Sequence, residues 1–109
     1  MKNFILITLL VTIFSCNAIE RESKITDFEN KYEDTLKPKK NCSYTAARYW
    51  IIGEVNDTIK VSFHGSEKYY FGKFQYDFFT DYYGMIDVEF NIDPYKATDG
   101  KIEVKYGIY

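Results

Sequence analysis

The 109-residue chain predicts an all-β protein, a small antiparallel β-sandwich or a partly closed barrel of five to six strands. Three observations predict this class. From residue 43 onward, apolar and polar residues alternate with a period of two, as in strands that bury one face. Turn-forming residues separate these segments, and no helical segment lies between them. The aromatic content of 19% suits the core of a small sheet protein.

The first predicted hairpin occupies residues 46–63. Residues 46–55 are apolar and β-prone, and residues 59–63 alternate strictly between apolar and polar side chains. Asn56 and Asp57 lie between them as a turn pair. Residues 64–67, with Gly65, make the next turn and lead into the following strand.

Three further strands complete the predicted sheet. Residues 69–78 form one aromatic strand, in which Gly72 marks a bulge or bend. Residues 86–92 show the most regular alternation in the chain. A longer loop over residues 93–100 precedes the last strand at residues 101–108. Sequential strands without intervening helices favour a meander of hairpins.

The segment before residue 43 has a different pattern. It is rich in charge, and its apolar residues recur at spacings of three and four, which predicts one stripe of an amphipathic helix. Pro38 ends any such helix. We therefore expect a domain division into a leader at residues 1–15, a polar tether with a short helix at residues 16–42, and a β domain at residues 43–109. The stripe consists of Ile25, Phe28, Tyr32 and Leu36.

The first sixteen residues carry a targeting signal. Lys2 supplies a positive charge, and residues 4–14 form an apolar run that is too short to span a bilayer. Ile13, Ser15 and Cys16 then place an aliphatic residue at −3, a small residue at −1 and a cysteine at +1. This segment resembles the signal peptide and lipobox of bacterial lipoproteins.

The resemblance implies an address and an anchor. Residues 1–15 would be removed, and Cys16 would carry a diacylglyceryl group with an additional acyl chain such as palmitate. Two or more chains hold a protein stably at a membrane. Asn17 follows the cysteine in place of the aspartate that retains some lipoproteins in the inner membrane. The resemblance thus favours the cell outer membrane.

Ordinary secretion is the alternative. Cys16 and Ala18 are small residues at −3 and −1 of a cleavage site after Ala18, which would release a soluble chain that begins at Ile19. Asn41 and Asn56 each begin an Asn-x-Ser/Thr triplet, which gives slight support to a glycosylated secreted protein.

Charge and cysteine content limit the partners. The formal charge is −2 and no basic patch is visible, so nucleic acid is not an expected partner. Cys16 and Cys42 are the two cysteines. If Cys16 carries lipid or is removed, the chain forms no intrachain disulfide. We interpret Cys42 as a partly buried residue at the start of a strand.

The sequence predicts no enzyme, no metal site and no cofactor. His64 is the single histidine, and together with Cys42 it gives too few ligands for zinc. The aspartates are interpreted as solvated strand faces and turns, because the loop at residues 93–100 lacks the calcium-loop pattern. No glycine-rich phosphate loop or GxSxG motif is present.

Tyrosine clusters near predicted turns are the candidate site. Loop tyrosines give large, amphipathic contacts suited to protein or sugar surfaces, whereas tyrosines that cap a small core are the alternative. We expect a membrane-anchored, non-enzymatic binding or structural module that contacts an envelope protein or glycan. An inhibitor or immunity protein against an envelope-acting lytic enzyme or toxin is the second hypothesis. The candidate patch is Tyr69, Tyr70, Tyr82, Tyr83 and Tyr95.

Overall fold

The computed structural model describes residues 17–83 and 85–109, and these residues form an all-β protein. The predicted signal peptide and Cys16 lie outside the described residues. Within them, no helix is present and all strand pairings are antiparallel. The strands are β1 (Ile19–Ile25), β2 (Tyr32–Leu36), β3 (Ala46–Phe63), β4 (Ser66–Asp81), β5 (Val88–Asp93) and β6 (Gly100–Ile108).

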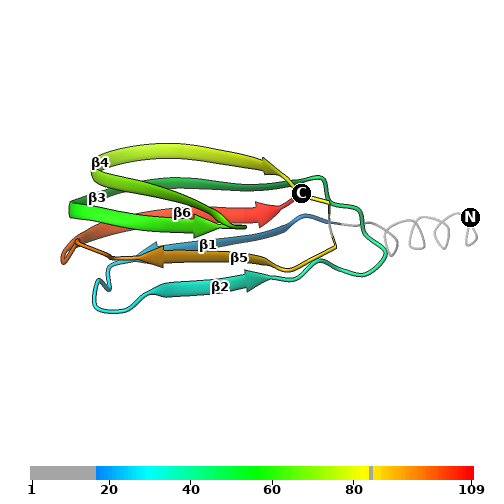
Figure 1. The fold of residues 1–109 in the computed structure, drawn as a ribbon, viewed down its shortest axis with the longest axis horizontal. Coiled ribbons are helices and arrows are strands. Elements are labelled where there is room, and N and C mark those ends of the chain that lie inside the picture. The colour runs from blue at the N-terminus through cyan, green and yellow to red at the C-terminus, as the bar shows by residue number, and fades with distance from the viewer. Residues whose placement is uncertain (1–16, 84) are drawn as a thin grey trace, which may run out of the picture.

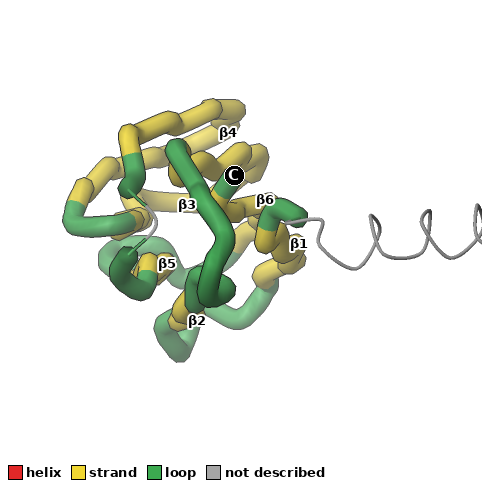
Figure 2. Tube along the Cα trace, turned by 90° about the vertical axis from the view of Figure 1, so that its right-hand side faces the viewer, coloured by secondary structure: helices red, strands yellow, loops and turns green. Residues whose placement is uncertain are grey.

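The sheet curls into a nearly closed barrel. Its strand order is β1-β6-β3-β5-β2, and β4 pairs with β3 outside this path. Figures 1 and 2 show β3 and β4 folding over the layer that contains β1, β2 and β5. The expected partly closed antiparallel barrel is confirmed. The expected meander of sequential hairpins is wrong, because among the described residues only β3 and β4 are consecutive strands that pair with each other.

The hairpin predicted around Asn56 and Asp57 is wrong, because β3 continues through these residues. The strand instead bends there: its register with β4 shifts between Val55 and Ile59, opposite Gly72. Asn56 does not turn the chain because its side chain is engaged elsewhere, accepting hydrogen bonds from the backbone N–H groups of residues 98 and 99 at 2.9 and 3.2 Å. The bulge or bend predicted at Gly72 is present as a bend: Gly72 has a φ of 64°, and the extra residues of the irregularity, 56–58, lie on β3.

The turn predicted over residues 64–67 is present. His64 and Gly65 connect β3 to β4, and Phe63 pairs with Ser66. Their φ angles are 48° and 84°, and two positive φ values identify the primed turn type that matches the twist of a hairpin. Because the hairpin bends in its middle, this turn returns toward the other end of β4, where the His64 ring lies 5.5 Å from the Tyr82 ring.

The helical tether predicted before residue 43 is wrong, and the β structure begins at Ile19. β1 pairs with β6 along its full length, and β2 pairs with β5. Backbone hydrogen bonds to these two neighbours outweigh the local helical pattern. The apolar stripe still contributes to the core, since Ile25 and Leu36 are buried in it and the partly buried Phe28 and Tyr32 pack against it.

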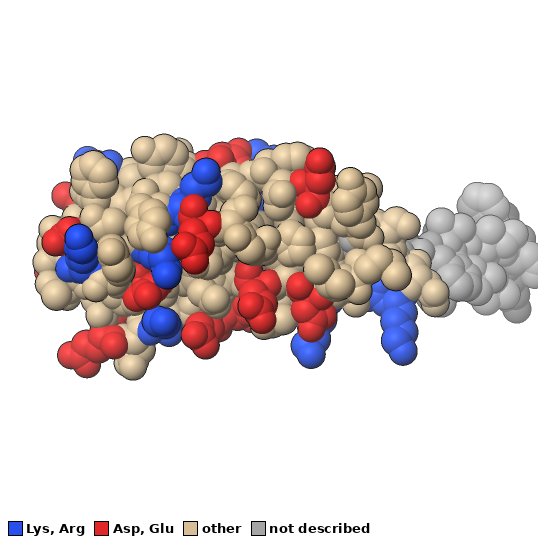
Figure 3. All heavy atoms as spheres, viewed as in Figure 1, with Lys and Arg blue, Asp and Glu red and all other residues tan. Residues whose placement is uncertain are grey.

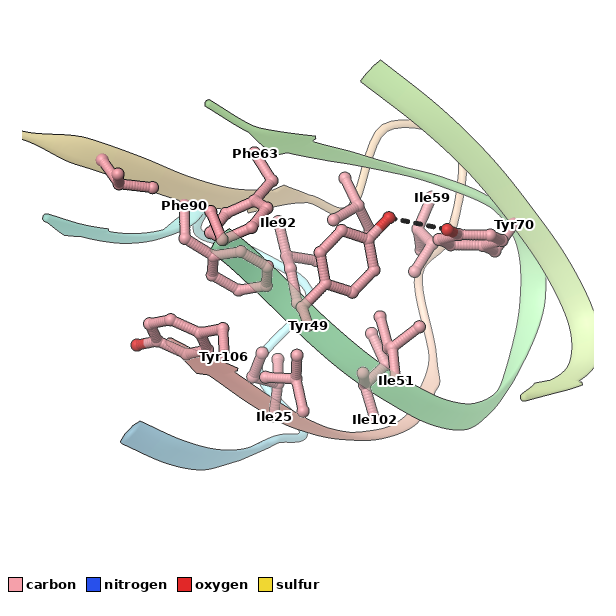
Figure 4. Close-up of a cluster of buried hydrophobic side chains, with 14 of the residues drawn as sticks. Ile25, Tyr49, Ile51, Ile59, Phe63, Tyr70, Phe90, Ile92, Ile102 and Tyr106 are labelled. Atoms are coloured by element: carbon pink, nitrogen blue, oxygen red, sulfur yellow. Dashed lines mark hydrogen bonds between the residues drawn. The ribbon is translucent and has the colours of Figure 1, made fainter. Parts of the chain in front are cut away.

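Aromatic rings fill the barrel interior. Tyr49 packs edge-on against Phe63 at 5.4 Å, and Phe90 stacks on Tyr106 at 4.2 Å. Figure 4 shows the buried hydroxyl pair of Tyr49 and Tyr70, whose oxygens are 2.7 Å apart. Among the described residues, no buried side-chain nitrogen or oxygen lacks a hydrogen-bond partner. Buried aromatic and aliphatic side chains therefore pack together across the barrel interior.

The barrel has two distinct ends, which are visible in Figure 1. We call the end at the bend of β3 and β4 the distal end; it carries the loops at residues 26–31 and 94–99. The opposite, proximal end carries residues 17–18, the loops at residues 37–45 and 82–87, and the C-terminus. Three hydrogen bonds join the proximal segments: Tyr44 Oη to Asn17 O at 3.5 Å, Tyr82 N to Thr45 O at 3.1 Å, and Thr45 N to Tyr109 O at 2.7 Å.

Candidate functional site

The five tyrosines of the predicted patch do not form one surface. Tyr70 and Tyr82 are buried, whereas Tyr69, Tyr83 and Tyr95 are exposed. Tyr69 and Tyr95 meet at the distal end, and Tyr83 lies in the loop at the proximal end. The structure therefore divides the predicted patch into two core residues, one distal pair and one isolated proximal residue.

Tyr70 and Tyr82 belong to the core. Tyr70 stacks on Phe74 with ring centroids 5.4 Å apart, and its burial raises the pKa of its hydroxyl. Tyr82 donates its hydroxyl to the carbonyl oxygen of Ile86 and packs against His64. For these two residues the interpretation of core-capping tyrosines holds.

The distal pair is part of an exposed cluster. The Tyr69 and Tyr95 ring centroids are 5.8 Å apart, and the Lys96 ammonium lies 5.5 Å from the Tyr95 ring. Phe71 follows Tyr69 by two residues on β4 and is 72% exposed. We call Tyr69, Phe71, Tyr95 and Lys96 the distal aromatic patch. It combines apolar rings, hydroxyls and a cation, which suits contact with another macromolecule.

Strand pairing positions both tyrosines. Lys60 of β3 pairs with Tyr69 on one side and with Asp93 of β5 on the other, and Tyr95 follows Asp93 by two residues. The Tyr95 N–H donates to Asp93 Oδ1 at 2.9 Å, which fixes Tyr95 at a φ of 56°. The next N–H, that of Lys96, donates to Thr58 O at 3.0 Å. The Tyr95 turn is thus fixed to the barrel before any partner binds.

Charged groups of both signs surround the distal end. Lys31 lies 3.7 Å from Asp93. In the loop between β1 and β2, Asp27 accepts hydrogen bonds from the Glu29 N–H and the Asn30 amide, and these bonds lower the pKa of the Asp27 carboxyl. The distal end therefore carries charges of both signs as well as exposed aromatic rings, a combination found in many protein interfaces.

A groove crosses the outward side of β1, β6, β3 and β4. Two adjoining hollows of about 860 and 720 Å³ have four wall residues in common: Lys24, Ile52, Gln75 and Glu103. Trp50 lies in the first hollow, but its ring already holds the Arg48 guanidinium at 4.1 Å and the Lys105 ammonium at 5.4 Å. These cations belong to the chain itself, so the indole offers little free surface for a ligand to stack on.

Sequence reasoning missed this groove. Its signal was Trp50 and Ile52 at the polar-face positions of the predicted strand over residues 46–55, where a half-buried strand normally carries hydrophilic residues.

A polar cluster joins the two terminal strands of the sheet path. Arg21 of β1 donates to Asp34 Oδ1 of β2 at 2.5 Å, so side chains bridge the two strands where no backbone ladder does. The buried Tyr106 donates its hydroxyl to Asp34 Oδ2 at 2.5 Å, and the Tyr32 hydroxyl lies 2.5 Å from that of Tyr106. Partial burial alone raises the pKa of Asp34, but the bonds from Tyr106, Arg21 and the Thr35 N–H together lower it.

This cluster closes the barrel and offers no reactive group, since its carboxylate, guanidinium and hydroxyls are engaged with one another. Burial and the bond to Asp34 raise the pKa of Tyr106 far above its usual value, so its hydroxyl stays protonated. No group of three or more His, Cys, Asp or Glu side chains is arranged to hold a metal ion in residues 17–83 and 85–109.

Cys42 lies in the loop before β3, is half-buried as expected, and is disulfide-bonded. The chain's other cysteine is Cys16, outside the described residues. No helix in the described part of the chain is both long and apolar enough to cross a membrane.

Comparisons with known proteins assign the chain to no family. No protein-family model matches the chain. No curated protein matches it either. Among solved structures, the chain is similar to a de novo designed double-stranded β-helix determined by solution NMR, with 13% identity and a TM-score of 0.45 over 84% of this chain and 99% of that one.

Proposed function

We propose that the protein is a cell-envelope lipoprotein, anchored through Cys16 in the outer membrane, that acts as a non-enzymatic binding module. Its contact surface is the distal aromatic patch, and its partner is another protein of the envelope. The observation that carries this proposal is the exposed pair of Tyr69, on β4, and Tyr95, on a fixed turn, at the end of the barrel opposite Asn17.

The composition of the patch supports a protein partner. Tyrosine gives a large contact area with few rotatable bonds, so little conformational entropy is lost on binding. The hydrogen bonds that hold Tyr95 and Lys96 reduce that cost further. The surrounding charges of both signs suit a polar interface rim.

The two ends of the barrel suit two different roles, membrane attachment at the proximal end and partner contact at the distal end. The described chain starts at the proximal end, where Asn17 accepts the Tyr44 hydroxyl. A lipid on Cys16 would attach this end to the membrane and direct the distal aromatic patch away from it. The groove around Trp50 lies along the side of the barrel and remains accessible in this orientation.

The structure gives Cys42 a disulfide bond, and the proposed lipid on Cys16 excludes Cys16 as the partner in that bond. A lipidated cysteine sulfur is a thioether, and a thioether sulfur forms no disulfide. The lipid-anchored form and a Cys16–Cys42 disulfide therefore exclude each other within one molecule. The mass of the mature protein distinguishes them, because only one of the two forms carries acyl chains.

Site-specific photocrosslinking in living cells tests the contact surface. A photoreactive phenylalanine at Tyr95 should give one discrete protein adduct, and the same group at Phe79, an exposed residue of β4, should not. With the purified partner, Tyr69→Ala and Tyr95→Ala should each weaken binding by about tenfold or more. Phe79→Ala should leave the affinity unchanged.

Three results would contradict the proposed contact. One is an adduct from Phe79 that equals the adduct from Tyr95. Another is an unchanged affinity in both tyrosine variants whose circular dichroism matches that of the wild type. A glycan as the sole ligand of the patch would also contradict a protein partner.

The inhibitor or immunity hypothesis uses the same surface. Tyr95 lies in a turn after β5 with a positive φ, and projecting turns of this kind can enter an enzyme cleft. If the crosslinked partner is a lytic enzyme or toxin, the purified chain should lower its activity. Tyr95→Ala should then relieve that inhibition.

A further inference from the structure

We infer that the proximal end of the barrel rests on the lipid surface, with Tyr83, Met85 and Ile86 inserted into the membrane interface. We call these three residues the proximal apolar loop. The inference rests on the proposed lipid anchor at Cys16 and adds a second point of membrane contact. A lipid surface is the occupant because the start of the described chain, the apolar side chains and a cluster of lysines occur at the same end.

The proximal apolar loop is unusually exposed. Tyr83 is 86% exposed, Met85 85% and Ile86 62%. All three lie between β4 and β5, outside the strands. Neighbouring large apolar side chains that are this exposed mark an interaction surface more often than a free surface. An aromatic residue beside aliphatic ones is also typical of segments that enter the membrane interface.

The base of the loop is held by the core. Tyr82 is buried and donates its hydroxyl to the carbonyl oxygen of Ile86. Its N–H donates to Thr45 O at 3.1 Å, which ties the loop to the segment before β3. The exposed side chains are therefore presented by a fixed base, and little conformational entropy is lost when they insert.

The segment that would connect a lipidated Cys16 to the barrel is short. β1 begins at Ile19, and Asn17 and Ala18 alone separate it from Cys16. Three extended residues span about 10 Å at most. A lipid on Cys16 therefore cannot hold the barrel far from the headgroups. The tether expected at residues 16–42 would have allowed such a separation, but residues 19–25 and 32–36 are strands of the barrel.

The hydrogen bonds of the proximal end place this start beside the loop. Asn17 is bonded to Tyr44, and the next residue, Thr45, is bonded to Tyr82. Figure 1 shows the loop at residues 82–87 at the end where β1 begins and the C-terminus lies. A membrane that holds Cys16 would thus meet the proximal apolar loop first.

Lysines accompany the apolar side chains. Lys37, Lys39 and Lys40 are exposed in the adjacent loop, and the Lys37 ammonium lies 4.0 Å from the Asp87 carboxylate. Asp87 pairs with Lys37, whereas Lys39 and Lys40 extend the basic character of the same loop. Figure 3 shows basic side chains projecting from this end of the described residues. Exposed lysines beside inserted apolar residues attract anionic headgroups.

A fluorescence experiment tests the orientation. The protein purified from membranes is reconstituted into vesicles of phosphatidylethanolamine and phosphatidylglycerol with brominated acyl chains, which quench tryptophan on close approach. In one variant, Trp50→Phe is combined with Tyr83→Trp, and in the matched control it is combined with Tyr95→Trp. Both sites are exposed, so both substitutions preserve the core. We expect emission at position 83 to fall about twofold or more and emission at position 95 to stay unchanged.

The outcomes separate the inference from the anchor. If the reconstituted protein carries lipid by mass and positions 83 and 95 are quenched equally or not at all, the proximal apolar loop does not touch the membrane. If the purified protein carries no lipid, the proposed anchor fails. The two variants are then mixed with the same vesicles as soluble chains. Quenching at position 83 alone still supports the lipid-binding surface, and the absence of quenching overturns it.

Discussion

Replacing Tyr106 with phenylalanine tests the polar cluster that closes the barrel. The substitution removes one hydroxyl and keeps the ring, which is fully buried and stacks on Phe90 at 4.2 Å. The hydroxyl donates to Asp34 Oδ2 at 2.5 Å and lies 2.5 Å from the Tyr32 hydroxyl. Tyr106→Phe therefore leaves one lone pair of a half-buried carboxylate and one tyrosine hydroxyl without this partner.

The expected loss follows from these contacts. A hydrogen bond to a charged group contributes about 1.5–3 kcal/mol. Asp34 keeps the bond from the Thr35 N–H and the ion pair with the half-exposed Arg21, and solvent weakens the latter. We expect the free energy of unfolding to fall by about 2 kcal/mol. For a domain of this size, such a loss lowers the Tm by roughly 10 °C.

Tyr109→Phe is the matched control. The Tyr109 hydroxyl also donates to a carboxylate, Glu20 Oε2, at 2.5 Å, but this bond lies at the exposed surface. Its removal should change the free energy of unfolding by less than about 1 kcal/mol. Urea denaturation and thermal melting of the mature chain measure both variants. Equal losses in the two variants, or a Tyr106→Phe loss below about 0.5 kcal/mol, would refute the reasoning.

Three further predictions concern acid stability and packing. The contacts that lower the pKa of Asp34 stabilise the folded chain fully above about pH 4, and this stabilisation is lost as the pH falls through the folded pKa. In Asp34→Asn the midpoint of urea denaturation should therefore fall less steeply as the pH is lowered. Gly100→Ala should cost about 3 kcal/mol, because its Cβ would lie 2.3 Å from Glu54 O at a φ of 150°; a loss below 1 kcal/mol would contradict this packing. Tyr82→Ala should lower the free energy of unfolding by about 3–5 kcal/mol, and Tyr83→Ala should lower it by less than about 0.5 kcal/mol. The reverse order would contradict a buried Tyr82 and an exposed Tyr83.

The strands with a strict period of two were predictable. β5 and β6 lie at or near their expected positions, and the Gly65 turn and Gly72 bend follow from local backbone preferences. β1 and β2 were not predictable from their own residues, since their apolar spacing matches a helix. Pairing with β6 and β5 decides their structure, and those partners are distant in the sequence.

The candidate site was predicted in part. Tyr69 and Tyr95 are exposed and in contact, as expected for a patch. The burial of Tyr70 and Tyr82 depends on the bend of β3 and β4, which returns the His64 turn to the far end of the hairpin. Alternation along one strand carries no information about such a bend. Asn56 and Asp57 suggested a turn, but hydrogen bonds from the loop at residues 94–99 hold Asn56 in a continuous strand.

The intact mass of the mature protein, purified from its native membrane, shows whether Cys16 carries the lipid anchor. We expect a chain that begins at Cys16 and carries a diacylglyceryl group with an additional acyl chain. A chain that begins at Ile19 without lipid, or an unlipidated chain with a Cys16–Cys42 disulfide, would contradict the lipid anchor.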